Sequence, residues 1–235
     1  MMRNGKLITA AIAATLALLV FAGACSAQVG AMSGNSVGWV FLKTDELNGQ
    51  LTDHGFAEMP KGMFIWGGYG IGDIPGGKWS IGGWGAGGNA KSVSGSGASA
   101  KTATLALSMG GIMAQYNISV SEKVRFGLGA VLGGGAATLT ATSGQVGGFE
   151  DLLGPGHSSS AWRPYLLAQP QASLAFPVSQ MIDARISGGY TFMYAPVGWI
   201  EGSRFREHFQ GPLKTIGVPF IELGISFGGP MGASD

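Results

Sequence analysis

Apolar and polar residues alternate along most of this chain with the period of two that is typical of β-strands. The clearest run lies at 123–140, where Val124, Phe126, Leu128, Ala130 and Leu132 alternate with smaller or polar residues. Residues 112–120 alternate in the same way, and only Ser121 and Glu122 separate the two runs. The pattern therefore predicts two antiparallel strands joined by a tight hairpin.

The same alternation predicts strands at 165–176, 182–194 and 215–227. Glycine-dense runs at 63–72 and 78–88 predict another hairpin, and 37–43 predicts a further short strand. The strand at 112–120 extends upstream through Gly110, and the predicted strands number about eight, with ten as the alternative. The apolar phase changes at Gly110 and Gly111, where a β-bulge is expected, and Pro219 marks another phase change.

Short and long connections alternate along the chain. The short ones lie at 73–77, 121–122 and 177–180, and the long ones at 44–62, 89–100, 143–161 and 195–212. In an up-and-down sheet this places every short turn at one end, the pattern of transmembrane barrels with short periplasmic turns and long outer loops. Residues 45–54 are expected to form a short amphipathic helix that caps the barrel mouth, or a plain loop.

The competing fold is a soluble β-sandwich, in which the apolar faces of two sheets meet. Two features favour the barrel: the polar faces lack the Lys, Glu and Asp of a solvated surface, and the strands exceed the usual five or six residues. Charged residues make up 11% of the chain, against about 25% in ordinary soluble domains. The 43 glycines and 46% hydrophobic content also disfavour an ordinary soluble enzyme and a disordered chain.

The N-terminus has the order of a secretory signal peptide. Arg3 and Lys6 precede an uncharged run that ends in small residues, so residues 1–27 are expected to be removed, leaving a single barrel domain at 28–235. Cleavage by an ordinary signal peptidase after Ala27 competes with lipidation of Cys25, because residues 22–25 resemble a lipobox. Removing Arg3 and Lys6 leaves 12 of the 14 basic side chains against 13 acidic ones, and no nucleic-acid partner is suggested.

The interior of an eight-stranded barrel is filled by side chains rather than by water. Four charged residues fall on predicted inward faces: Arg125, Asp183, Arg185 and Glu222. We expect them to form a buried, mutually paired cluster, or to lie in water near strand ends. An aromatic girdle at the membrane surfaces is expected from Trp39, Trp66, Tyr69, Trp79, Trp84, Trp162, Tyr165, Tyr190, Phe192 and Tyr194.

These features resemble the small bacterial outer-membrane barrels of the OmpA and OmpX type. Residues 222–227 look like the C-terminal strand signal of such barrels, with Gly224 and Phe227 in the matching places, although the chain continues for eight residues to Asp235. The resemblance is architectural and points to no particular functional family. It implies a bacterial outer-membrane location, with outer-membrane lipid and the barrel-assembly machinery as partners, and leaves the extracellular ligand unidentified.

The sequence suggests little chemistry. His54, His157 and His208 are dispersed over predicted outer loops, so neither a metal site nor a cofactor is expected. Ser203 and His208 lie in one charged loop and are the only candidates for a lipid-directed hydrolase, but no spacing motif supports them. We therefore expect no catalytic residues and a non-enzymatic barrel that presents loops for adhesion, binding or envelope integrity. The alternatives are a narrow solute channel, a lipid-modifying enzyme and a secreted or lipid-anchored β-sandwich.

Overall fold

Eight long strands form one closed antiparallel sheet. The computed structural model describes residues 31–75, 77–97, 100–121, 123–143, 157–179, 181–201 and 208–228. The barrel strands are β1 (Ala31–Val40), β2 (Met63–Asp73), β3 (Trp79–Ser94), β4 (Lys101–Ser121), β5 (Val124–Ser143), β6 (His157–Ser179), β7 (Ile182–Tyr194) and β10 (Thr215–Gly228). Their order is β5-β4-β3-β2-β1-β10-β7-β6, and β6 pairs back with β5. The predicted antiparallel barrel of eight strands is confirmed.

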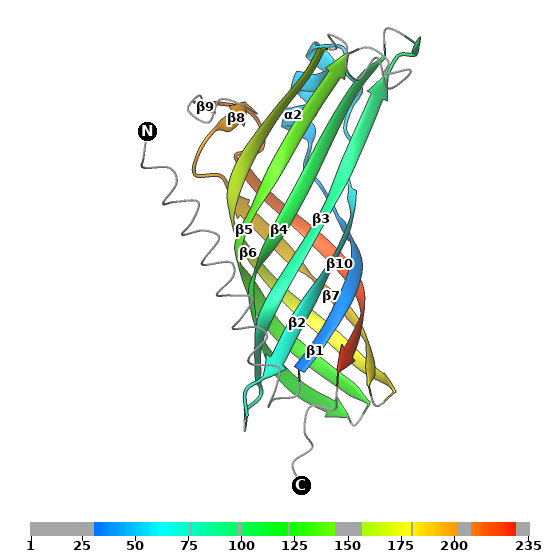
Figure 1. Ribbon diagram of the computed structural model, residues 1–235, viewed down its shortest axis with the longest axis vertical. Coiled ribbons are helices and arrows are strands. Elements are labelled where there is room, and N and C mark those ends of the chain that lie inside the picture. The colour runs from blue at the N-terminus through cyan, green and yellow to red at the C-terminus, as the bar shows by residue number, and fades with distance from the viewer. Residues whose placement is uncertain are drawn as a thin grey trace, which may run out of the picture.

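The two ends of the barrel differ. At the lower end in Figure 1, β1 begins and β10 ends, and tight connections join β2 to β3, β4 to β5 and β6 to β7. At the upper end, long connections follow β1, β5 and β7, whereas β3 and β4 are separated only by residues 95–100. The predicted segregation of short and long connections therefore holds, with one outer connection shorter than expected.

Four neighbouring strands rise above the others. Strands β3, β4, β5 and β6 have 16, 21, 20 and 23 residues, whereas β1, β2, β7 and β10 have 10, 11, 13 and 14. Figure 1 shows the upper halves of these long strands standing above the rest of the barrel. We call residues 87–94, 101–108, 136–143 and 157–164, which pair in register across the four strands, the raised wall.

The bulge predicted at Gly110 and Gly111 is wrong. Strand β4 pairs without a register shift from Lys101 opposite Ser143 to Ser119 opposite Arg125, and the irregularity lies beside the hairpin, between Ser119 and Ser121. Strand β10 likewise pairs with β7 without interruption on both sides of Pro219. The phase changes in the sequence have another cause: in the lower barrel the apolar side chains point outward, and in the upper barrel they point inward.

The upper interior is an apolar core. Leu105, Leu107, Met63, Met193 and Val218 are buried there by strands from both sides of the barrel. The same core includes buried residues of helix α2 (Asp45–Asp53), one of the two structures predicted for this segment, and Trp199 of β8 (Trp199–Glu201), which pairs with β9 (His208–Phe209). Helix α2 contributes Leu47 and Leu51 to this core.

Polar contacts hold the helix in place. The side-chain amide of Asn48 donates to Met59 O (3.1 Å) and accepts from Met59 N (2.7 Å). Lys101 of β4 donates to His54 O at the end of the helix (2.7 Å). The connection between β1 and β2 is thus fastened both to itself and to the raised wall.

Several predicted boundaries are corrected. Strand β1 begins at Ala31 rather than at residue 37, and parts of the predicted loops 89–100 and 143–161 belong to β3 and β6. Serine and asparagine at these positions resemble loop composition, but Asn89, Ser158 and Ser160 face outward on strands, and Ser92 is buried on the inner face of β3. The predicted girdle is wrong for Tyr69, Trp84 and Tyr165, which are buried inside the barrel. Within the described residues, no helix is both long enough and apolar enough to cross a membrane.

Candidate functional site

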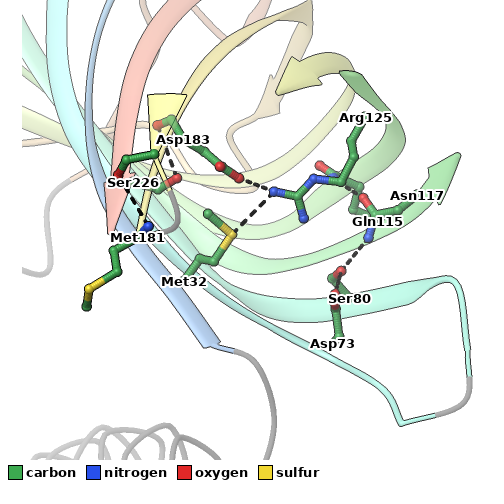
Figure 2. Close-up of polar contacts among 10 residues, drawn as sticks. Met32, Asp73, Ser80, Gln115, Asn117, Arg125, Met181, Asp183 and Ser226 are labelled. Carbon is green, nitrogen blue, oxygen red and sulfur yellow. Dashed lines mark hydrogen bonds and ion pairs between the residues drawn. The ribbon is translucent and has the colours of Figure 1, made fainter. Parts of the chain in front are cut away.

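The four charged residues predicted to face inward all lie on the inner surface of the lower barrel. Strand alternation places Arg125 on β5, Asp183 and Arg185 on β7, and Glu222 on β10 toward the interior, and the last three are at least 94% buried. Arg125 forms an ion pair with Asp183 across the barrel, and its guanidinium also contacts Met32 Sδ (3.8 Å) (Figure 2). This charge pair joins β5 to β7, which are not adjacent in the sheet.

A chain of hydrogen bonds crosses the interior from Arg185 to Asp73. Arg185 Nη2 donates to Gln115 Oε1 (2.6 Å), and Gln115 Nε2 donates to Asn117 Oδ1 (2.6 Å). Asn117 Nδ2 donates to Ser80 Oγ (2.5 Å), which donates to the carboxylate of Asp73 (Figure 2). Every bond runs from the cation toward the carboxylate, so the two ends fix the orientation of both amides. Because side-chain amides do not readily pass protons on, the chain is suited to holding strands together rather than to proton relay.

Glu222 and Arg185 lie near each other without a direct ion pair. Glu222 Oε2 accepts from Trp84 Nε1 (3.3 Å), and the guanidinium carbon of Arg185 lies 4.8 Å from the centre of the Tyr69 ring. A cavity of about 20 Å³, lined by Tyr69, Arg125 and Arg185 among others, has room for roughly one water molecule. Side chains therefore fill the interior at the level of this cluster.

Breaking the Arg125–Asp183 pair is expected to destabilise the barrel. Asp183→Asn leaves the Arg125 charge in a mostly enclosed site, and because Arg125 is still 30% exposed we expect a loss of about 2 kcal/mol, below the 3–5 kcal/mol of a fully buried pair. Equilibrium unfolding in detergent micelles measures it. The double variant Arg125→Met with Asp183→Asn should recover part of the loss. If the losses caused by Arg125→Met alone and Asp183→Asn alone simply add up in the double variant, the two residues are not coupled.

The outer surface of the lower barrel is an apolar belt. Every barrel strand contributes large exposed hydrophobic residues: Val37 and Trp39 on β1, Phe64 and Trp66 on β2, Trp79 and Ile81 on β3, Ile112 and Ile118 on β4, Leu128 and Leu132 on β5, Leu166 and Leu174 on β6, Ile186 and Phe192 on β7, and Ile221, Leu223, Ile225 and Phe227 on β10. Of the charged residues described on the eight barrel strands, only Lys91 occupies an outward position, and it lies in the raised wall. The belt therefore closes around the barrel without a charge.

Arg163, which the sequence analysis missed, fastens the upper loop. It is 1% exposed, and its guanidinium donates to the carbonyls of Val197 (3.1 Å), Gly211 (3.2 Å) and Pro212 (2.8 Å). Trp199 lies beside it and also donates to Pro212 O (3.0 Å). The signal was present in the sequence, because Arg163 continues the inward alternation of residues 165, 167 and 169 beyond the predicted start of that strand.

The remaining predicted residues are placed as follows. Gly224 faces inward beside the Tyr69 ring, and Phe227 faces outward near the lower end of β10 with 54% of its side chain exposed. Cys25, the signal segment and Ser203 lie outside the described residues, and only the backbone of His208 is described, in β9. Their predicted lipidation, cleavage and hydrolase roles therefore stay predictions.

Comparison with known proteins gives structural similarities only. The sequence matches no protein-family model and no curated protein. Ail, the attachment invasion locus protein of Yersinia pestis, solved with the heparin analogue sucrose octasulfate, is 15% identical over 84% of this chain and 98% of its own (TM-score 0.42). Neisserial surface protein A is 11% identical over 84% of this chain and 94% of its own (TM-score 0.35). The outer membrane protease OmpT of Escherichia coli is 11% identical over 85% of this chain and 94% of its own (TM-score 0.37). These similarities concern fold alone.

Proposed function

We propose that this protein is a bacterial outer-membrane barrel whose lower part spans the bilayer and whose raised wall and upper loops form a rigid, non-enzymatic binding platform outside the cell. The observation that carries the proposal is the uncharged apolar belt. A contiguous exposed apolar surface that surrounds a whole molecule is avoided in water, because its hydration is unfavourable, and is favourable in lipid.

The dimensions of the belt support this assignment. On β4 the outward residues from Ile112 to Val120 are apolar or aromatic, a length close to the roughly 9–11 residues with which a tilted strand crosses a membrane. Above Ile112 the outward positions of the same strand are small or polar: Gly110, Ser108, Ala106, Thr104 and Thr102. The strand therefore changes surroundings at about Gly110, from lipid below to water above.

The orientation follows from the same boundary. The tight turns and both ends of the described chain lie below the belt, and the raised wall, α2 and β8–β9 lie above it (Figure 1). Short periplasmic turns and longer outer connections are the usual arrangement in outer-membrane barrels. The platform is rigid because β3 to β6 continue into it without a break and Arg163 and Asn48 fasten the segments that cover it.

Single-cysteine variants test the orientation, since Cys25 is the only cysteine of the chain and precedes the barrel. In a chain without Cys25, Thr140→Cys on the raised wall should react with a membrane-impermeant maleimide in intact cells. Lys123→Cys in a lower turn should react only after the cells are broken, and Leu128→Cys in the belt should stay unreactive in the folded protein. Labelling of Lys123→Cys in intact cells would reverse the orientation, and rapid labelling of Leu128→Cys in the native protein would remove the membrane assignment.

A channel function is not part of the proposal, because the polar cluster fills the lower barrel and the apolar core fills the upper barrel. In planar bilayers the purified protein should therefore give no steady single-channel current steps. The matched control is a porin reconstituted by the same procedure. Reproducible steps of one size from this protein would support the channel instead of the closed platform.

A further inference from the structure

The outer face of the raised wall has an unusual composition. Each of its four strands offers four outward positions, and eight of these sixteen are serine or threonine: Thr102, Thr104, Ser108, Thr138, Thr140, Thr142, Ser158 and Ser160. Lys91 is the only charged residue among the sixteen. Solvated sheet surfaces ordinarily carry many long charged side chains, whereas this face is polar and carries a single charge.

The hydroxyls are arranged in rows across the sheet. Lys91, Thr104, Thr140 and Ser160 lie opposite one another on four successive strands, and Thr102, Thr142 and Ser158 form the next row beside Val93. Neighbouring strands lie about 4.8 Å apart. Within the rows Thr140 Oγ1 lies 3.4 Å from Ser160 Oγ, and Thr142 Oγ1 lies 3.4 Å from Ser158 Oγ. These long contacts leave donor and acceptor capacity for an external partner, since each hydroxyl offers one donor and two lone pairs.

The face is also preorganised. Its strands are held on the inner side by the apolar core, through the buried Ala90, Ala103, Leu105 and Ala137. Serine and threonine side chains are short, so a ligand that binds them immobilises less side-chain entropy than one that binds lysine or glutamate. A rigid sheet of hydroxyls with one cation complements a polyhydroxylated ligand that carries an anionic group.

We propose that this face binds the phosphorylated sugar chain of a glycolipid in the leaflet that surrounds the barrel, the chemistry of lipopolysaccharide. The inference rests on the proposed function, because the membrane assignment sets the height of the face. The wall continues the belt strands upward for eight residues, about 26 Å along the strand. Its hydroxyls therefore stand where the sugars of neighbouring lipids project, and Lys91 pairs with a phosphate in the same row.

The experiment uses the full-length protein folded in neutral detergent micelles and, as the probe, the deacylated core oligosaccharide released from lipopolysaccharide. Titration calorimetry is expected to show saturable binding by the wild type. The triple variant T104V/T140V/S160A should bind about tenfold or more weakly, because three hydroxyls are lost. K91Q should weaken binding and reduce its dependence on salt. The matched control is T215V, which removes an exposed threonine on β10, outside the wall.

Three results would overturn the inference: no binding by the wild type, equal binding by the triple variant, or a monomer–dimer equilibrium that the same substitutions abolish, which would assign the face to a second copy. If the triple variant fails to fold, as judged by its mobility on unheated gels, the single variants T104V and T140V replace it, each expected to bind a few-fold more weakly. The maleimide labelling at Lys123 and Leu128, which lie outside the raised wall, tests the membrane assignment independently of the glycan face. Correct labelling at these two positions without glycan binding would therefore reject the inference alone.

Discussion

Leu128→Lys is expected to destabilise the barrel in phospholipid vesicles by about 3 kcal/mol, within the 2–4 kcal/mol found for lysine near the bilayer midplane. Leu128 is central among the outward residues Val124, Phe126, Leu128, Ala130 and Leu132 of β5, and 48% of it is exposed. If that exposure is to lipid, the ammonium group must be moved out of water or reach the interface at a cost in free energy. Reversible unfolding by denaturant, followed by tryptophan fluorescence, measures the effect.

The matched control is Thr140→Lys, on the same strand and the same outer face but in the raised wall. In water a lysine there should change the free energy of unfolding by no more than about 0.5 kcal/mol. The difference between the two changes in the free energy of unfolding reports whether each position faces lipid or water, because the strand, the face and the introduced side chain are the same. Equal effects at both positions would contradict the boundary between lipid and water placed near Gly110.

Gly82→Ala is expected to destabilise the protein by about 3 kcal/mol or to prevent folding. Gly82 faces the interior from β3, and a Cβ built on it would overlap the carbonyl oxygen of Gly70 and lie 2.7 Å from Ile71 Cα. Both atoms belong to the backbone of β2, so the clash is relieved only by moving a strand of the closed sheet. Folding yield, scored by mobility on unheated gels, and denaturant unfolding of the folded fraction measure the loss.

The adjacent residue provides the control. Gly83 faces outward, and a Cβ there would meet only Gly111 O, at 3.9 Å. Gly83→Ala should leave stability unchanged or raise it by up to about 1 kcal/mol, since alanine restricts the unfolded chain. A large loss from Gly83→Ala, or none from Gly82→Ala, would show that inward crowding of the backbone is not the reason for glycine on this strand.

Much of the fold was predictable because alternation is a local property. Leu128 and Gln171 differ from their neighbours in polarity, and the period of two identifies the strands whatever surrounds them. Asp183, Arg185, Glu222 and Arg125 were placed inward for the same reason. Mutual pairing among them was one of the two expectations, but which residues pair was not predictable, since the Arg125–Asp183 pair and the Arg185–Gln115 bond join strands that are not adjacent in the sheet.

The sequence by itself determined that this is an antiparallel β protein of about eight strands with unlike ends and unlike faces. It did not determine which face is inside at each height. Leu107 and Ile112 are both apolar, yet Leu107 is 3% exposed in the core and Ile112 is 57% exposed on the belt. Alternation records only that two faces differ, and the change of phase at Gly110 has the same pattern as a bulge. Only the closed barrel shows that the strands keep their register while the apolar side chains change from the outer to the inner surface. The physical reason is that apolar side chains avoid water, and water is excluded by the core in the upper barrel and by lipid around the lower barrel.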